Sequence, residues 1–419
     1  MSKRRIVVVN DDSVARGGTA VLAVMSAKAL ADRGHEVIWL CGDAGENPEL
    51  AAHGVEVVAL GSRPLLDLPA KRALIDGVHN RAAAQLVGDF VARRDTDETV
   101  YHVHSWAQIC SPSIFPALAP VSRRTLLHAH DMFLACPNGV YMDYRKNRAC
   151  TRVPNSFDCI TTHCDKRSYA QKLWRVAREA RVHAALGNLE GWGGIVVIHP
   201  GMKEKLARAG YRADRLFAVR NPIVAFTDER IKAEDNRSLL YVGRLEVDKG
   251  VGEVAAAAAR ADVPLILVGE GPMRAELEAR YPQATLAGWV DKAGIGAYAA
   301  RARALVMPSR HPEPFALVIA EAAASGLPVL VSDMAAMAGE VETAGLGFAF
   351  DVFDPKSFDA AIARVMDLPA GEIRALSERG RTGDAALGNT RDGWIDALEA
   401  EYDRVLAETG ARGRGSVQA

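Results

Sequence analysis

The sequence has few of the features that mark secreted, membrane-spanning or nucleic-acid-binding proteins. It holds only 6 cysteines in 419 residues, too few for a secreted disulfide scaffold. No apolar run approaches the roughly 20 residues that cross a bilayer, and the first apolar run, residues 6–9, is too short for a signal peptide. The 51 Lys and Arg balance 52 Asp and Glu, so the charge does not favour nucleic acid as a partner. We therefore expect a cytoplasmic protein that touches membranes only at their surface.

Length and patterning predict an α/β protein with more than one domain. A chain of 419 residues is too long for one ordinary core, and its 49% hydrophobic content is enough to bury two. Short Val/Ile/Leu runs alternate with Ala-rich helical stretches, which is the pattern of parallel sheets with crossover helices. Strands are expected at residues 5–9, 36–40, 55–60, 99–103, 125–129 and 195–198, and then at 239–242, 264–268, 304–307 and 328–331.

The two sets of strands predict two doubly wound, Rossmann-like domains that face each other across a cleft. We place an N-terminal domain at 1–220 with a Cys-containing insertion at about 131–183, a polar linker at 221–238, and a C-terminal domain at 239–390. The stretch 391–419 is expected to be a helix and a tail that packs on either domain. Ligands of such sheets bind beyond the carboxyl ends of the strands, so the residues that follow the strands are the candidates for function.

Two cations follow the first strand of the second half. Gly243-Arg244 and Lys249-Gly250 flank a short segment in which glycines allow close approach of the backbone, and the two positive charges suit a diphosphate. A solvated turn is the alternative interpretation. Gly269 and Val290 lie in turns after the next strand-like runs, where backbone groups are able to meet a nucleobase.

Two glutamates lie in the most informative stretch, residues 308–322. We expect a helix to open at Pro314, where its free N–H groups favour an anion, and Glu313 to lie beside that anion and bind hydroxyl groups. Glu321 falls in the apolar run 316–324, where a carboxylate without a partner is costly. Alternatively, Glu313 is a helix cap and Glu321 a surface residue.

These motifs together resemble the donor-binding domain of glycosyltransferase family 4, which has the GT-B fold. The resemblance implies that Arg244 and Lys249 hold the donor diphosphate, that Glu313 binds the transferred sugar, and that Glu321 binds the nucleotide ribose. Further donor contacts are implied at Gly17 and Gly18 of the first loop and at Gly243, Gly269, Val290, Phe315, Ala316 and Leu317. Ala316 stands where the family usually has glycine, and Ala335-Ala336 where it often has a glycine pair, so the choice of sugar stays open.

The first half contains two His-x-His pairs, His102 with His104 and His128 with His130. Residues i and i+2 of a strand share one face, so each pair presents two imidazoles together. Some zinc hydrolases begin a metal site in this way, although no carboxylate-rich motif completes the coordination here. The resemblance implies instead that His130 faces the donor sugar near its reacting carbon and that His104 lines the same cleft. Ordinary packing is our interpretation of His102 and His128.

A cysteine cluster and a basic stretch follow His130. Cys136, Cys150, Cys159 and Cys164 do not have zinc-ribbon spacing, so packed thiols, a small zinc site and a redox-labile pair all stay open. In the basic stretch 166–181, a positive charge recurs every third residue at the four positions Lys172, Arg175, Arg178 and Arg181. On a helix this stripe is either a solvated face or a surface that attracts anionic lipid or a lipid-linked acceptor.

The sequence therefore predicts a retaining glycosyltransferase of polysaccharide assembly that uses a UDP- or GDP-sugar and a glycan or glycolipid acceptor. No other cofactor is implied. Two alternatives stay open: a zinc-dependent hydrolase that uses His102, His104, His128 and His130, and a partner subunit that binds nucleotide sugars without transferring them. A dinucleotide-dependent dehydrogenase is disfavoured because no Gly-x-Gly-x-x-Gly follows the first strand.

Overall fold

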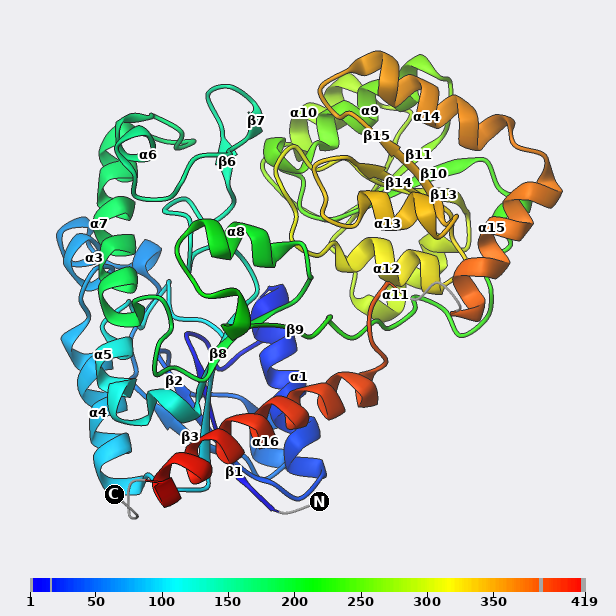
Figure 1. Ribbon diagram of the computed structural model, residues 1–419. Helices are drawn as coiled ribbons and strands as arrows, with labels where there is room; N and C mark the ends of the chain where they lie inside the picture. The colour runs from blue at the N-terminus through cyan, green and yellow to red at the C-terminus, as the bar shows by residue number, and fades with distance from the viewer. Residues whose placement is uncertain (1–2, 16, 384–386, 416–419) are drawn as a thin grey trace. The chain divides into compact units, whose positions relative to one another are not determined.

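The computed structural model describes residues 3–15, 17–383 and 387–415 and divides into two compact units. Unit 1 comprises residues 1–140, 151–220 and 392–419, and unit 2 comprises residues 141–150 and 221–391. Each unit has its own parallel sheet and its own core (Figure 1). The domain limits expected from the sequence, including a linker at 221–238, stay a prediction.

Unit 1 is built on a sheet of seven parallel strands among the described residues, in the order β3-β2-β1-β4-β5-β8-β9. Its central strands are buried throughout because helices cover both faces. Tyr101 packs on Phe90 of α4, whereas the neighbouring His102 contacts Tyr402 of α16 on the opposite face. The strands are β1 (Arg5–Asn10), β2 (Glu36–Cys41), β3 (Glu56–Ala59), β4 (Thr99–Val103), β5 (Thr125–Ala129), β8 (Gly194–Val197) and β9 (Leu216–Ala218).

The helices of unit 1 connect these strands and return at the end of the chain. They are α1 (Gly18–Asp32), α2 (Pro48–Ala52), α3 (Ala70–Asp76), α4 (Arg81–Arg94), α5 (Ile114–Leu118), α6 (Phe157–Thr161), α7 (Tyr169–Leu186), α8 (Met202–Arg208) and α16 (Arg391–Gly415). Short 3-10 turns lie at η1 (Leu65–Asp67), η2 (Ala119–Arg124) and η3 (Ala213–Arg215).

Unit 2 has a parallel sheet with the strand order β12-β11-β10-β13-β14-β15. Its strands are β10 (Ser238–Val242), β11 (Leu265–Val268), β12 (Thr285–Gly288), β13 (Ala302–Met307), β14 (Val329–Ser332) and β15 (Gly347–Phe350), and the hairpin β6 (Met142–Asp143) and β7 (Arg148–Ala149) belongs to the same unit. The helical segments are η4 (Ala233–Asp235), η5 (Val247–Lys249), α9 (Val251–Arg260), α10 (Arg274–Arg280), α11 (Lys292–Ala299), α12 (Leu317–Ala324), α13 (Ala338–Thr343), α14 (Pro355–Asp367) and α15 (Ala370–Thr382).

The predicted α/β class with two doubly wound parallel sheets is confirmed, and each predicted strand overlaps a strand of the structure. The predicted strands do not include β9, β12 and β15, because each is only three or four residues long, at the edge of its sheet, and carries little alternation. Within the described residues, no helix is both long enough and apolar enough to cross a membrane.

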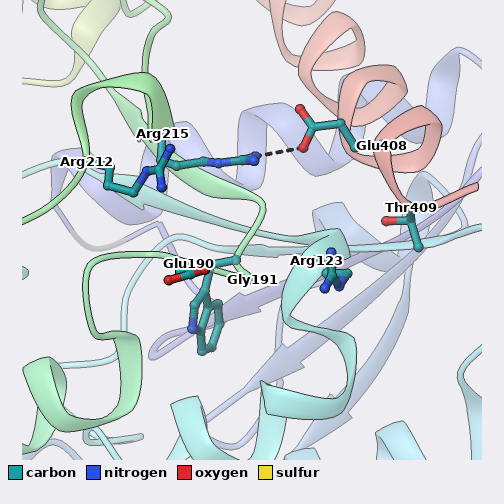
Figure 2. A pocket seen from close by; sticks show the side chains of 8 residues that line it. Arg123, Glu190, Gly191, Arg212, Arg215, Glu408 and Thr409 are labelled. Carbon is teal, nitrogen blue, oxygen red and sulfur yellow. Dashed lines mark hydrogen bonds and ion pairs between the residues drawn. The ribbon is translucent and has the colours of Figure 1, made fainter. Parts of the chain in front are cut away.

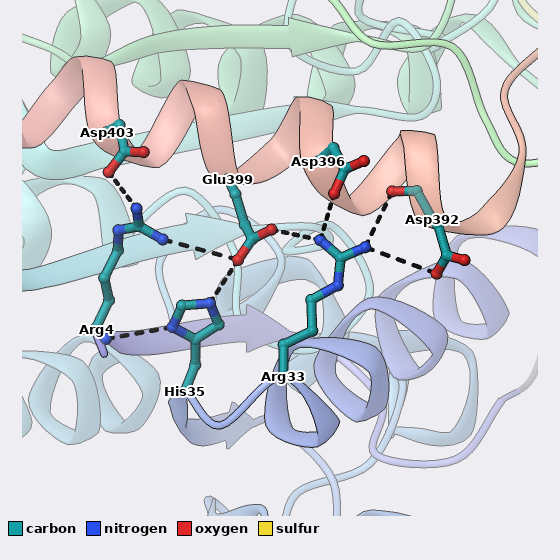
Figure 3. A network of polar contacts seen from close by, with 7 residues as sticks. All are labelled: Arg4, Arg33, His35, Asp392, Asp396, Glu399 and Asp403. Carbon is teal, nitrogen blue, oxygen red and sulfur yellow. Dashed lines mark hydrogen bonds and ion pairs between the residues drawn. The ribbon is translucent and has the colours of Figure 1, made fainter. Parts of the chain in front are cut away.

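The C-terminal helix α16 packs on unit 1. The sequence left open which domain this helix would pack on. Its face toward the sheet is made of wholly buried side chains at Trp394, Ile395, Leu398, Tyr402 and Val405. Beside them, the carboxylate of Glu399 is 2% exposed, and Arg33 and His35 bind it, with His35 Nε2 at 2.6 Å (Figure 3). Chain segments more than 350 residues apart are thus joined by one buried carboxylate.

We expect Glu399→Ala to lower the free energy of unfolding of unit 1 by about 3 kcal/mol, because it leaves the buried His35 without its carboxylate acceptor and takes one of several acceptors from the half-buried Arg33. Asp403 of the same helix pairs with Arg4 but is 58% exposed, so Asp403→Ala should cost at most about 1 kcal/mol. Urea unfolding followed by circular dichroism measures both values. Equal costs would show that Glu399 does not anchor α16.

Candidate functional site

A cavity of about 170 Å³ in unit 2 lies at the carboxyl ends of β10 and β13. Parallel sheets bind ligands at this edge. Seven of the predicted residues line the cavity, namely Gly243, Arg244, Lys249, Glu313, Phe315, Ala316 and Leu317. Residues up to 74 positions apart in the chain therefore contribute to one site.

The centre of this cavity is an ion pair between Lys249 Nζ and Glu313 Oε1. Ser309 Oγ donates a second hydrogen bond to the same carboxylate oxygen, at 3.1 Å, and His311 Nε2 lies 3.6 Å from it. Burial alone would raise the pKa of Glu313, but the Lys249 ammonium holds that pKa below its usual value. Glu313 is therefore ionised and able to accept hydrogen bonds from hydroxyl groups.

The backbone at Gly250 places Lys249 beside Glu313. Gly250 has a φ of 73°, and a Cβ atom there would lie 1.8 Å from the carbonyl oxygen of Pro308. Only glycine allows the segment after β10 to pack this closely against the segment after β13. Gly269 serves a similar purpose, because its Cβ would lie 1.9 Å from the Gly243 oxygen. The structure therefore gives the predicted donor contact Gly269 a packing role, and it is not among the residues that line the cavity.

Arg244 is an exposed cation of the cavity. Its side chain is 65% exposed and pairs with Glu246 at 2.6 Å, while its carbonyl oxygen accepts a hydrogen bond from Tyr241 Oη at 2.7 Å. The backbone is thus fixed and the guanidinium is at the surface. An exposed ion pair of this kind contributes little stability, so an anion in the cavity is able to recruit the guanidinium at small cost.

The prediction that a helix opens at Pro314 is wrong, because α12 begins at Leu317. Glu313 instead forms a short parallel bridge with Ala335, and the backbone N–H of Ala336 donates to its carbonyl oxygen at 3.0 Å. This pairing keeps the chain extended through Pro314. Ala316 caps the helix and has no side-chain acceptor, and Ala316, Leu317 and Val318 at the start of α12 line the cavity.

Glu321 has the partner that its apolar surroundings require. Lys292 of α11 pairs with its carboxylate, which is 14% exposed. Burial raises the pKa of Glu321, and Lys292 opposes that rise. Neither Glu321 nor Val290 is among the residues that line the cavity, so their predicted donor contacts stay a prediction. The sequence offered no sign of Lys292, which lies 29 positions earlier on another helix.

In unit 1 the four histidines form one compact group at the carboxyl ends of β4 and β5, here called the histidine array. His102 Nε2 lies 3.1 Å from His128 Nδ1, and His104 Nδ1 lies 3.0 Å from His130 Nε2. His128 and His130 stack with their ring centres 4.2 Å apart. Burial lowers the pKa of His102 and of His130 to about 3, and it lowers those of His104 and His128 as well. All four imidazoles are therefore neutral at pH 7.

The histidine array fits a hydrogen-bonded group better than a zinc centre. Ligand atoms of His102, His104 and His128 do lie within 4.8 Å of one another. However, both nitrogens of His102 are already engaged, one by Tyr402 and one by His128. Among the residues that the structure describes, no carboxylate contributes to the pKa shifts of these three imidazoles, so no nearby negative charge would offset a buried divalent ion. The geometry thus gives no support to the hydrolase alternative.

Gly17 caps α1, which begins at Gly18. This helix follows β1, and β1 is the neighbour of β4 in the sheet. Gly17 has a φ of 84°, which favours glycine, and a Cβ on either residue would meet no atom within 4 Å. The N-terminus of α1 is therefore open, as a contact to a phosphate or hydroxyl group requires. That contact stays a prediction.

The basic stripe expected on α7 is not a solvated face. Lys172 is wholly buried with Nζ 3.4 Å from Cys159 Sγ, and Arg178 is 5% exposed among the rings of Trp106, Phe133 and Trp174. Arg175 is 19% exposed and lies 3.3 Å from Asp165, whereas Arg181 is exposed. Cys136, Cys159 and Cys164 are buried in unit 1, Cys150 lies in unit 2, and zinc binding by this cluster stays open.

Unit 1 has a cavity of about 130 Å³ at the amino-terminal ends of β5, β8 and β9 (Figure 2). This end of the sheet is opposite to the edge where such sheets bind ligands. Two of its arginines already have carboxylate partners, because Arg215 pairs with Glu408 at 2.7 Å and Arg212 with Asp214 at 2.8 Å. We therefore do not place the active site there.

We expect acid to destabilise unit 1 through the histidine array. An unfolded histidine takes up a proton near pH 6.5, whereas folded His102 does so only near pH 3, so stability is lost as the pH falls below 6.5. Each neutral imidazole contributes a slope of at most about 1.4 kcal/mol per pH unit. Urea unfolding at pH 5 to 8 should show a smaller slope for His102→Leu than for the wild type or for the exposed control His79→Asn. Equal slopes in all three would contradict this assignment.

Comparisons with known proteins find similarity that lies mainly in unit 2. Residues 225–383 match the family model of glycosyl transferases group 1. A GDP-mannose-dependent alpha-mannosyltransferase of Mycolicibacterium smegmatis is 33% identical over 193 residues, which are 44% of this chain and 49% of that protein. A glycogen synthase of Mycobacterium tuberculosis is 37% identical over 155 residues, 34% of this chain and 37% of that protein. The matched part is thus at most about half the length of these curated relatives.

Solved structures share the fold of the whole chain. An Anabaena protein crystallised with UDP and glucose has a TM-score of 0.65 at 15% identity and covers 96% of this chain and 100% of its own. The sucrose-phosphate synthase of Thermosynechococcus elongatus has a TM-score of 0.66 at 19% identity, with 99% and 100% covered. At such identities the likeness shows the fold alone. Residues 225–383 are thus similar to the glycosyl transferases group 1, and the whole chain shares the fold of solved glycosyltransferase structures.

Proposed function

We propose that the protein is a retaining glycosyltransferase that moves a sugar from a nucleotide diphosphate to a glycan or glycolipid acceptor in polysaccharide assembly. The observation that carries the proposal is the Lys249–Glu313 pair in a cavity that also holds Arg244. Such a cavity offers cations for a diphosphate and a carboxylate for sugar hydroxyls within one site. The matched family model covers all three residues.

The chemistry follows from where charge develops. As the bond between the sugar and the diphosphate breaks, negative charge grows on the leaving phosphate, and Lys249, Arg244 and the uncapped start of α12 stabilise it. Glu313 accepts hydrogen bonds from the hydroxyls of the sugar and orients it. In the proposed reaction the leaving phosphate deprotonates the acceptor, so no nucleophilic side chain is required, and the neutral imidazole of His130 serves as a hydrogen-bonding group toward the sugar.

The donor is proposed to be a UDP- or GDP-sugar. One relative is described as GDP-mannose-dependent, and one protein of similar fold was crystallised with UDP. Both nucleotides share the diphosphate that Lys249 and Arg244 suit, so these two residues leave the base open. The proposal requires no further cofactor and no nucleic acid partner.

We expect Lys249→Ala and Arg244→Ala each to lower kcat/KM for a nucleotide sugar by at least about a hundredfold, a loss of about 2.7 kcal/mol of transition-state stabilisation. The matched control is Lys356→Ala, which removes an exposed lysine from the first turn of α14. Release of nucleoside diphosphate by the purified chain is the readout. Full activity in both pocket variants would refute the assigned site, and a wild-type chain that binds donor without turnover would favour the partner-subunit alternative.

We also propose that the cytoplasmic protein touches the inner face of the membrane through unit 1. The observation is an apolar patch on α3, α6 and α7, whose members Leu74, Ile75, Phe157, Tyr169 and Leu173 are 37% to 84% exposed. Hydrogen bonds join these helices, from Trp174 Nε1 to the Leu74 oxygen at 2.8 Å and from Tyr169 Oη to the Ile160 oxygen at 3.0 Å. The exposed cations on the same helices and the turn before α7 are Lys71, Arg72, Lys166 and Arg167. Apolar and basic groups together suit an anionic lipid surface.

We expect the triple change Leu74→Ser, Ile75→Ser and Phe157→Ser to lower binding to vesicles that contain phosphatidylglycerol by at least about tenfold, because it removes most of the patch. Cosedimentation measures binding, and the control is Val224→Ser, which changes an apolar residue of unit 2 that is 41% exposed. Vesicle binding that is equal in all variants, or absent from the wild type, would refute the membrane contact.

A further inference from the structure

The histidine array extends beyond the four histidines to a tyrosine of the C-terminal helix. Tyr402 of α16 is wholly buried, and its hydroxyl lies 2.8 Å from His102 Nδ1. The two residues are 300 positions apart, and their rings meet edge to face with centres 5.6 Å apart. The array thus has one end at His130 and the other end at Tyr402.

The Tyr402 hydroxyl is one end of a chain of hydrogen bonds through two histidines. If it donates to His102 Nδ1, then His102 carries its proton on Nε2 and donates it to His128 Nδ1, 3.1 Å away. In the reverse order His128 Nδ1 donates to His102 Nε2, and His102 Nδ1 donates to the hydroxyl oxygen. In either order the tautomers of the two histidines are set together with the orientation of one hydroxyl group.

His128 transmits this order to His130 by contact. His128 lies in β5 and His130 directly follows that strand, so both side chains are on the same face. Their rings stack with centres 4.2 Å apart and an angle of 10° between the ring planes. His104 holds the other side of His130 through the hydrogen bond of 3.0 Å between Nδ1 and Nε2. The ring of His130 is thus fixed between a stacked face and a hydrogen-bonded edge, and its Nδ1 is the nitrogen left for another partner.

We propose that Tyr402 is a positioning residue for His130, which it orients through His102 and His128. The proposal rests on the function proposed above, in which His130 meets the donor sugar. It gives the C-terminal helix a role in the reaction, because α16 supplies the hydroxyl at the start of the array. Packing alone would require only the ring of Tyr402, which phenylalanine also provides.

The test compares Tyr402→Phe with Tyr101→Phe. Tyr101 is also wholly buried and donates its hydroxyl to Asp95 at 3.0 Å, but it lies on the opposite face of β4 from His102. Both changes remove one buried hydroxyl and keep the ring, so they should cost similar stability. Only the first should alter the array.

Nitrogen NMR of histidine-labelled protein reports the tautomers without any need for turnover. In Tyr402→Phe we expect the ring signals of His102, His128 and His130 to shift, and kcat for the nucleotide sugar to fall about tenfold with the KM for donor unchanged. In Tyr101→Phe both readouts should match the wild type. Unchanged histidine signals in Tyr402→Phe, or equal losses of kcat in both variants, would overturn the proposal. A wild-type chain without turnover would instead refute the proposed function, and the NMR signals would still decide whether Tyr402 orders the array.

Discussion

The ion pair between Lys249 and Glu313 is the interaction on which the site in unit 2 depends. It joins the segment after β10 to the segment after β13, and the close approach of Gly250 to the Pro308 oxygen makes it possible. The pair keeps the cavity electrically balanced while no anion is present, so Lys249 is held in place without the cost of an isolated buried charge. A diphosphate would compete for Lys249 and leave the Glu313 carboxylate to the hydroxyl groups of the sugar. Binding of the two parts of a donor would therefore be coupled through one contact.

Unit 1 follows the opposite electrostatic rule. Its candidate residues are neutral imidazoles, kept uncharged by burial, and their order comes from hydrogen bonds and stacking. The cost is acid sensitivity, because each buried imidazole resists a proton that the unfolded chain accepts. The same carboxyl-end edge of a parallel sheet thus carries charged chemistry in one unit and neutral chemistry in the other.

The sequence was sufficient to predict the features that depend on local pattern. Short apolar runs between helical stretches predicted the central strands of both sheets. The positions of Arg244, Lys249 and Glu313 after such runs, together with the family resemblance, predicted residues that line one cavity. It failed where a distant partner decides the outcome. The bridge of Glu313 to Ala335 moves the start of α12 to Leu317, and the partner of Glu321 is Lys292 on another helix. Lys172 and Arg178 looked like a surface stripe because burial is a property of tertiary packing. Tyr402 carried no motif at all, since only the return of α16 to unit 1 brings it to His102.

The central claim is that Lys249 binds the diphosphate and Glu313 binds the sugar of one donor. Calorimetric titration of the full chain and of Glu313→Gln with a nucleoside diphosphate and with the matching nucleotide sugar tests it most directly. Without its carboxylate partner Lys249 is free, so the account predicts that the variant binds the nucleoside diphosphate as tightly as the wild type or more tightly, while its affinity for the nucleotide sugar falls. An equal loss of affinity for both ligands, or no change for either, would contradict it.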